Sequence, residues 1–192
     1  GTDYEGDIFP NSRIWWGEPS SGPVYELVSS RSPDFWGMMS PDGSHVAFSR
    51  YNTRTGQFEL FTAETRNIPR GRNVQITPRR DFVYDSFAPS WSPDGTRIAF
   101  ACSQRDTSGG GFPLHDWLTN NTSICVVDAD GRNVHVIGSN SRIYPPAWMN
   151  NDVVIFAGDD THPVCPDSLC AFDYTLNQTI KVADELDYGA SD

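Results

Sequence analysis

The stretch "FAPSWSPDGTRIAF", Phe87 to Phe100, places a tight turn between two apolar runs, and nearly the same pattern occurs earlier as "FWGMMSPDGSHVAF", Phe35 to Phe48. In the turn, Pro93 presets φ, Asp94 bonds back to the backbone and Gly95 accepts a positive φ. A lone turn of this kind would be uninformative. Because the turn and both flanking strands recur together, we predict a repeat architecture.

The repeat extends beyond these strands in a fixed order. We align "FELFT" (58–62) with "ICVVD" (124–128), "GRNVQIT" (71–77) with "GRNVHVI" (131–137), and a degraded third copy, Trp148, "VVIFAG" (153–158) and "LCAFD" (169–173), with the corresponding segments of the second. Upstream, "RIWWGEPSSGPVYELV" (13–28) reads as half a copy. Each full unit therefore predicts four antiparallel strands, which is the blade of a β-propeller. The expected fold class is all-β.

The repeat divides the chain into one propeller unit of incomplete blades. Within 1–192 we expect a half blade at 13–30, full blades at 31–78, 84–138 and 143–183, and a tail at 184–192. Propellers need roughly four to eight blades, so uncovered sheet faces are expected at both ends. A longer parent chain, joined terminal strands, or further copies forming an oligomer or a filament would each complete the ring.

The repeat carries a resemblance to a known family. "PSWSPDGTRIAF" (89–100) followed by "ICVVDADGRNV" (124–134) resembles the repeats of TolB-like β-propellers, the WD-repeat-like blades also found in the non-catalytic propellers of prolyl oligopeptidase relatives. The resemblance covers about Ile14 to Val182 and is most specific for Pro89 to Val136. It implies a propeller fold and, more loosely, a non-catalytic interaction role.

Charge and hydropathy exclude several classes of partner. The formal net charge is −11 and the 14 Lys and Arg residues are scattered, so no basic stripe is expected to neutralise a nucleic acid. The longest apolar run, Val153–Ala157, is far short of the roughly 20 residues needed to span a bilayer. The chain begins at Gly1 without a signal peptide, which suggests a processed chain, an excised domain or part of something longer.

Two of the four cysteines fall on neighbouring strands of the second blade. Antiparallel pairing would bring Cys102, at the end of "IAFAC", next to Cys125 in "ICVVD", and we predict a disulfide between them. In our alignment the first blade has Arg50 and Glu59 at these positions, an opposite-charge pair suited to the same contact. Such a disulfide would stabilise the fold by about 3 kcal/mol in the chain-entropy model.

The remaining cysteines lie in the third repeat, where Cys170 matches Cys125 and the loop supplies Cys165 as its expected partner. The alternatives are four reduced thiols, or one zinc ion held by all four sulfurs, which the strand spacing disfavours. Two disulfides place the chain in an oxidising compartment, extracellular or periplasmic.

The long polar loop from Ser103 to Thr122 is the most site-like segment, because the connections expected on its side of the blades are long and variable. The candidate ligand-binding residues in it are Arg105, Asp106, His115, Asp116 and Trp117. An aromatic ring beside an imidazole and a carboxylate suits a protein or a glycan. The alternative is that Phe112, Leu114 and Trp117 only anchor the loop.

Other site signals are weaker. Glycosylation sequons occur at Asn120, Asn121 and Asn177. For calcium, the carboxylates of interest are Asp159, Asp160 and Asp167 together with Asp128 and Asp130, although none follows an EF-hand pattern and turns explain them adequately. No histidine has a ligand-like companion at fixed spacing, and no HExxH or GxSxG motif occurs. No metal centre or cofactor is therefore expected.

These observations predict a non-catalytic extracytoplasmic scaffold that binds a protein or glycan through its long-loop face, or that packs with copies of itself. The competing class is a propeller-type carbohydrate-active enzyme, a polysaccharide lyase or hydrolase. Such an enzyme would need a group of histidine, arginine and carboxylate side chains at the mouth of the central channel.

Overall fold

The computed structural model describes residues 12–17, 22, 25–26, 32–52, 57–66, 73–77, 84–104, 122–142 and 144–183. These residues form strands, turns and irregular segments, so the predicted all-β class is confirmed. In this part of the chain there is no helix that is long and apolar enough to cross a membrane. The strands are β1 (Trp15–Trp16), β2 (Tyr25–Glu26), β3 (Asp34–Met39), β4 (His45–Asn52), β5 (Gln57–Glu64), β6 (Asn73–Gln75), β7 (Tyr84–Trp91), β8 (Arg97–Gln104), β9 (Thr122–Asp128), β10 (His135–Gly138), β11 (Ala147–Trp148), β12 (Val153–Ala157), β13 (Leu169–Asp173) and β14 (Gln178–Ala183).

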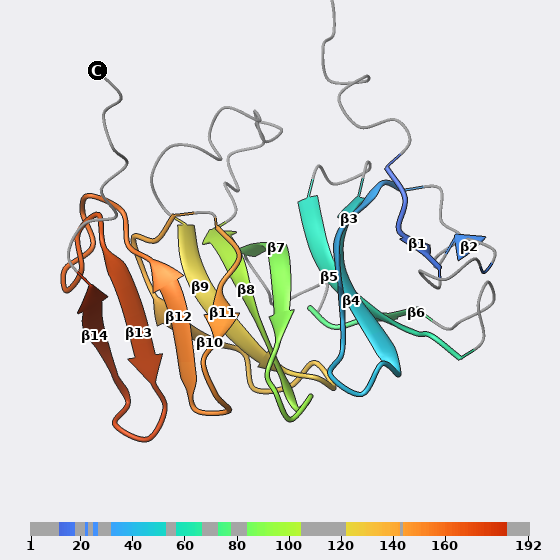
Figure 1. Cartoon of the computed structure of the whole chain (residues 1–192). Helices are drawn as coiled ribbons and strands as arrows, with labels where there is room; N and C mark the ends of the chain where they lie inside the picture. Colours follow the sequence, from blue (N-terminus) through green and yellow to red (C-terminus); the bar gives the residue numbers. More distant parts are fainter. Residues whose placement is uncertain are drawn as a thin grey trace, which may run out of the picture.

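Consecutive strands pair into separate antiparallel sheets that stand side by side (Figure 1). The pair β1-β2 precedes three four-stranded sheets with the orders β3-β4-β5-β6, β7-β8-β9-β10 and β11-β12-β13-β14. Each four-stranded sheet is thus one predicted repeat, and the three are referred to below as the first, second and third blades. The arrangement is a partial β-propeller.

The first strands of successive blades lie against one another. The indole Nε1 of Trp91 donates to the backbone oxygen of Met38 at 3.0 Å, and Nε1 of Trp148 donates to that of Ser90 at 3.0 Å. These bonds connect β7 to β3 and β11 to β7 at equivalent positions. The first strand of each blade therefore faces the common axis, and the last strand forms the outer edge.

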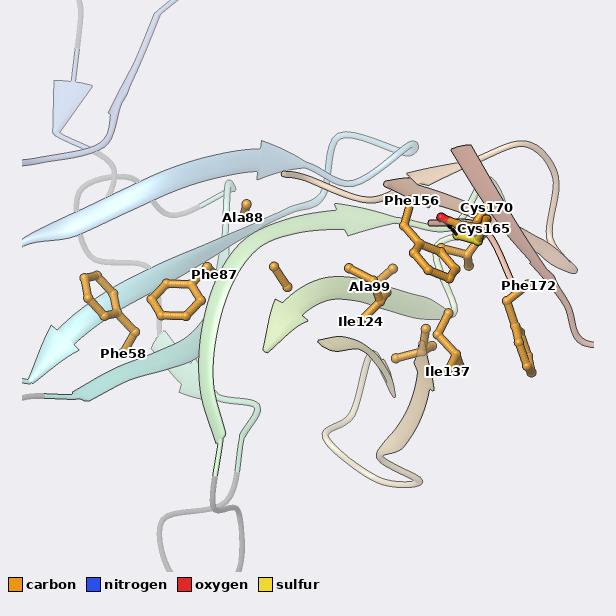
Figure 2. Close-up of a cluster of buried hydrophobic side chains, with 13 residues drawn as sticks. Phe58, Phe87, Ala88, Ala99, Ile124, Ile137, Phe156, Cys165, Cys170 and Phe172 are labelled. Carbon is orange, nitrogen blue, oxygen red and sulfur yellow. Dashed lines mark hydrogen bonds between the residues drawn. A yellow bond between two sulfur atoms is a disulfide. The ribbon is translucent and has the colours of Figure 1, made fainter. Parts of the chain in front are cut away.

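The hydrophobic core lies between blades, not inside one sheet. Between the first and second blades, Ala47 and Leu60 belong to one buried cluster with Ile98 and Phe100. Between the second and third blades, Ala99, Ala101, Ile124 and Val126 meet Val154, Phe156 and Phe172 (Figure 2). Successive side chains of a strand point to opposite faces, so one strand of the second blade serves both interfaces.

The "SPDG" turns have the predicted structure. An Asp42 carboxylate oxygen accepts bonds from the Ser40 hydroxyl at 2.6 Å and from the Ser44 backbone N–H at 3.0 Å. Asp94 makes the same contacts in the second blade, and Gly95 has a φ of 71°. In the third blade Asn150 replaces the aspartate and accepts the backbone N–H of Asp152 at 2.7 Å.

The strand register corrects one part of the repeat alignment. Arg97 lies opposite Asp128 on β9, whereas the equivalent His45 lies opposite Glu64 on β5. The segment equivalent to "ICVVD" is therefore 60–64, two residues later than we predicted. A shift of two residues keeps every side chain on the same face of the sheet, so alternation of apolar residues could not detect it.

The charged pair expected in place of the first disulfide is affected by this shift. Arg50 is equivalent to Cys102 and lies opposite Glu59, but Glu59 is equivalent to Ser123, and the residue equivalent to Cys125 is Phe61. The Arg50 guanidinium instead forms two bonds to the carboxylate of Asp34 on β3, at 2.7 and 3.1 Å. The disulfide itself joins diagonal neighbours on β8 and β9 with a Cα–Cα distance of 5.9 Å, within the usual range.

Candidate functional site

The connection between the second and third blades lies at the same end of the sheets as the β8–β9 and β12–β13 loops. The backbone N–H of Ser141 donates to the backbone oxygen of Thr122 at 2.8 Å, and the N–H of Arg142 donates to the backbone oxygen of Ala157 at 2.9 Å. At the opposite end, the N–H of Ala129 donates to Thr96 at 2.8 Å and so joins two short turns. The predicted separation into a long-loop face and a short-turn face holds here.

An aromatic group lies at this long-loop end of the first and second blades. The ring centroid of Trp36 on β3 lies 5.9 Å from those of both Phe58 and Phe87. The Phe58 and Phe87 centroids are 5.0 Å apart. Figure 2 shows these two phenylalanine rings side by side. Tyr51, near the end of β4, also contacts Phe58 at 5.0 Å. Phe58 and Phe87 are buried, whereas Trp36 is 40% exposed. A large side chain is thus presented to solvent on a buried aromatic base.

The backbone at Trp36 is unusual for its residue type. Trp36 has a φ of 51°, and its equivalent in the second blade, Ala88, has a φ of 47°. In both blades the register of the first strand shifts at this point, which is the signature of a bulge. Positive φ at a residue other than glycine costs about 1–3 kcal/mol and often occurs at functional positions.

The charged groups beside this aromatic group have side-chain partners. Asp34 is buried and receives both bonds from Arg50, whose guanidinium also lies 4.6 Å from the ring centroid of Phe61. Asn52 donates to the carboxylate of Glu59 at 3.4 Å. These contacts hold the ends of β3, β4 and β5 together. Among the described residues of this aromatic group, Trp36 is the large side chain that is exposed to solvent.

The ligand-binding residues predicted in the β8–β9 loop, Arg105, Asp106, His115, Asp116 and Trp117, lie outside the described residues, as do Asn120 and Asn121. Their loop leaves from Gln104 and returns at Thr122, both at the long-loop end. The third sequon residue, Asn177, is exposed in the turn between β13 and β14, with a φ of 50°. Trp36 was not among the sequence candidates, although the alignment does place this indole where the second blade has Ala88.

The loop between β12 and β13 is closed by the disulfide Cys165–Cys170, with a Cα–Cα distance of 5.8 Å. His162 is buried beneath it, and its Nδ1 lies 3.2 Å from the Cys165 sulfur. Within the described part of the chain, these three side chains are the group that could hold a metal ion. The sequence offered no ligand-like companion at fixed spacing for any histidine, and the proximity of His162 to both sulfurs is produced by the fold.

The chemistry of this group favours a structural role. Nδ1 of His162 accepts the backbone N–H groups of Val164 and Cys165 at 3.2 and 3.1 Å, so its lone pair is engaged. Burial lowers the pKa of His162, which favours the neutral ring that accepts these bonds. All four cysteine sulfurs are in disulfides, which is incompatible with a shared four-sulfur zinc site.

Four of the five carboxylates considered for calcium have partners in turns or loops. Asp159 accepts bonds from the backbone N–H and the hydroxyl of Thr161 at 2.7 and 2.8 Å, and Asp167 pairs with Arg142. The others are Asp128, which accepts a bond from Asn133, Asp130, which accepts a bond from Arg132, and the exposed Asp160. These contacts are those of side chains that stabilise loops.

Neither a family model nor a curated protein matches this sequence. Among solved structures, TolB from Acinetobacter baumannii is similar, with a TM-score of 0.57 and 20% identity over 84% of this chain and 35% of that one. The fold is that of a TolB-like β-propeller. A putative TolB from Agrobacterium tumefaciens is similar with a TM-score of 0.52 and 22% identity over 70% of this chain and 46% of that one.

A lyase shares this TolB-like fold. Oligogalacturonate lyase in complex with manganese is similar with a TM-score of 0.58 and 16% identity over 84% of this chain and 43% of that one. The chain thus spans less than half the length of each of these three propellers. Because the same blades occur in a lyase and in TolB, the fold does not select an activity.

Proposed function

We propose that this TolB-like chain is a non-catalytic interaction scaffold that binds a protein partner on its long-loop face. The observation that carries the proposal is the half-exposed indole of Trp36 on the buried rings of Phe58 and Phe87. A rigid aromatic side chain on a packed base is typical of the residues that dominate protein–protein binding energy. Because the bulge already fixes the backbone at Trp36, binding of a partner would cost little further conformational entropy there.

The surroundings of Trp36 support a binding role over catalysis. Arg50, on the adjacent strand β4, is engaged by Asp34, and we propose that this pair serves the fold and not a substrate. We propose that the β8–β9 loop adds contacts through Arg105, Asp106, His115, Asp116 and Trp117. Both disulfides support a location in an oxidising compartment, extracellular or periplasmic.

The proposal is tested with Trp36→Ala and a matched control, Leu176→Ala, which truncates an apolar side chain that is 59% exposed in the β13–β14 turn at the opposite end. Cross-linking and mass spectrometry on the extracytoplasmic fraction of the organism that produces this protein would identify a partner. The affinity of the purified partner for each variant would then be measured. We expect at least tenfold weaker binding for Trp36→Ala and unchanged binding for the control.

Two outcomes would contradict this function. Equal affinity of a purified partner for the wild type and Trp36→Ala would remove the aromatic group from the binding site. Release of products from a panel of polysaccharides by the wild-type protein would favour the carbohydrate-active class instead.

A further inference from the structure

The outward face of the third blade is mainly apolar, with Asp173 and Gln178 at its end next to the β13–β14 turn. On β12 and β13, the side chains that alternate with the buried Val154, Phe156 and Phe172 point away from the second blade. Register places Ile180 of β14 beside Ala171 on this same side. We call this surface the open face; its residues are Val153, Ile155, Ala157, Leu169, Ala171 and Ile180.

The second blade carries the same surface, where it is covered. Register makes Ala99 equivalent to Ile155 and Val126 equivalent to Ala171. Ala99 is 0% and Val126 1% exposed, because the third blade packs on them. On the open face, Ile180 is 42% exposed and Ile155 is partly exposed, whereas the small Ala171 between them is 2% exposed. The third blade therefore has the apolar surface on which a following sheet packs in this fold.

The third blade also has a residue at the position that accepts the tryptophan hydrogen bond in the first two blades. In each interface a tryptophan of the following blade donates to the first strand of the preceding blade, at Met38 and then at Ser90. The equivalent residue in the third blade is Ala147, which is exposed at the start of β11.

The opposite end of the row of sheets, at β1-β2, also presents apolar side chains to solvent. Ile14 packs on the buried cluster that contains Val46 and Phe48. The next side chain, Trp15, is 59% exposed, as alternation along an extended segment predicts. Met39, which occupies the position of Trp91 in the first blade, is 41% exposed. The β1-β2 end thus presents aromatic and apolar side chains in the direction from which a preceding sheet would approach.

We infer that the open face of one copy docks the β1-β2 end of a second copy, so that sheets follow one another between copies as they do within a chain. The β1-β2 end and the third blade lie at opposite ends of the row of sheets (Figure 1), so β1-β2 of one copy does not cover that copy's own open face. The interface is heterologous, since different surfaces meet, and repeated docking gives a ring or a filament. The net charge of −11 opposes association, so salt should strengthen it.

Two single variants separate the two halves of the interface. Ile180→Lys places a charge on the open face, and Trp15→Lys places one on the β1-β2 end; both side chains are exposed, so both variants should fold. Leu176→Lys is the matched control, because Leu176 is an exposed apolar residue in the β13–β14 turn and lies off the open face. Sedimentation velocity with light scattering would give the mass of each protein across a range of concentration and salt, after circular dichroism has verified folding.

We expect the wild type and Leu176→Lys to form multimers, and each of the other variants to dissociate at least tenfold more readily. The decisive sample is the mixture of Ile180→Lys with Trp15→Lys. It contains one intact open face and one intact β1-β2 end, so it should form a one-to-one pair and nothing larger. A single-copy mass for the wild type at high concentration and salt, multimers of Ile180→Lys as stable as the wild type, or a mixture without pairs would each overturn the inference. Trp36 takes no part in this interface, so the proposed function is tested separately.

Discussion

The indole Nε1 of Trp148 donates a 3.0 Å hydrogen bond to the backbone oxygen of Ser90, and thereby repeats, one blade later, the bond from Trp91 to Met38. The Arg97 guanidinium lies 5.1 Å from the ring centroid of Trp148. The tryptophan therefore joins two blades through a hydrogen bond, a cation–π contact and its packed surface.

The hydrogen bond and the packing are separable by substitution. Trp148→Phe keeps a ring in the interface but leaves the Ser90 oxygen without this donor, and should lower the free energy of unfolding by about 1 kcal/mol. Trp148→Ala also removes the packed surface and should cost about 3 kcal/mol. Urea unfolding of both variants would measure these differences; equal losses would mean that packing contributes nothing here.

The two disulfides should differ in the stability that they contribute. Cys102–Cys125 closes a sequence separation of 23 residues, and Cys165–Cys170 a separation of 5. Chain entropy predicts about 3 kcal/mol for the longer loop and about 2 kcal/mol for the shorter. Replacing each pair by alanines and comparing the midpoints of chemical unfolding tests this order, because all four sulfurs are buried and the packing losses are similar. A larger loss for the short loop would contradict the entropic account.

Tyr174 carries a buried hydroxyl without a hydrogen-bond partner among the described residues. Its ring also receives the Arg97 guanidinium at 4.6 Å, a contact that phenylalanine can keep. Tyr174→Phe removes the unpaired polar group, so we expect the free energy of unfolding to stay level or to rise by up to about 1 kcal/mol. A loss of more than about 1 kcal/mol in urea unfolding would show that the hydroxyl makes a stabilising contact.

The same hydroxyl gives a pH dependence. Burial raises the pKa of Tyr174 to about 12 from an ordinary value of 10.0. Between these two values the unfolded phenol ionises while the folded one keeps its proton, so this group leaves the free energy of unfolding unchanged with pH below about 10 and lowers it as the pH rises toward the folded-state value. Alkaline titration of the phenol absorbance should show one late transition that Tyr174→Phe lacks. A late transition that persists in the variant would assign it to another tyrosine.

Asp42 should contribute to acid sensitivity in the opposite sense. Bonds from Ser40 and Ser44 hold the pKa of Asp42 far below its ordinary 3.8. Its contribution to stability is present above 3.8 and declines as the pH falls through the folded-state pKa, since the unfolded carboxylate is protonated first. Asp42→Asn should therefore lose less stability than the wild type between about pH 5 and 3. Parallel losses in thermal melts at these pH values would exclude the contribution.

Local sequence was sufficient for the repeating unit. Pro93, Asp94 and Gly95 encode a turn through their own backbone preferences and short hydrogen bonds, and the alternating residues of "TRIAF" encode a half-buried strand. Both signals extend over a few neighbouring residues, so they could be recognised without a structure. The pairing of Cys102 with Cys125 followed from the antiparallel hairpin that such a unit forms.

Tertiary structure decided the strand register and everything that depends on the contact between blades. Alternation is unchanged by a two-residue shift, so only the pairing of β4 with β5 showed that Glu59 has no cysteine equivalent. Only the side-chain contacts showed that Arg50 binds Asp34 on β3. The exposure of Trp36 and Ile180 could not be predicted from the sequence either, because burial of a sheet face depends on whether another sheet covers it. A strand encodes which of its side chains share a face; the neighbouring sheet determines which face meets water.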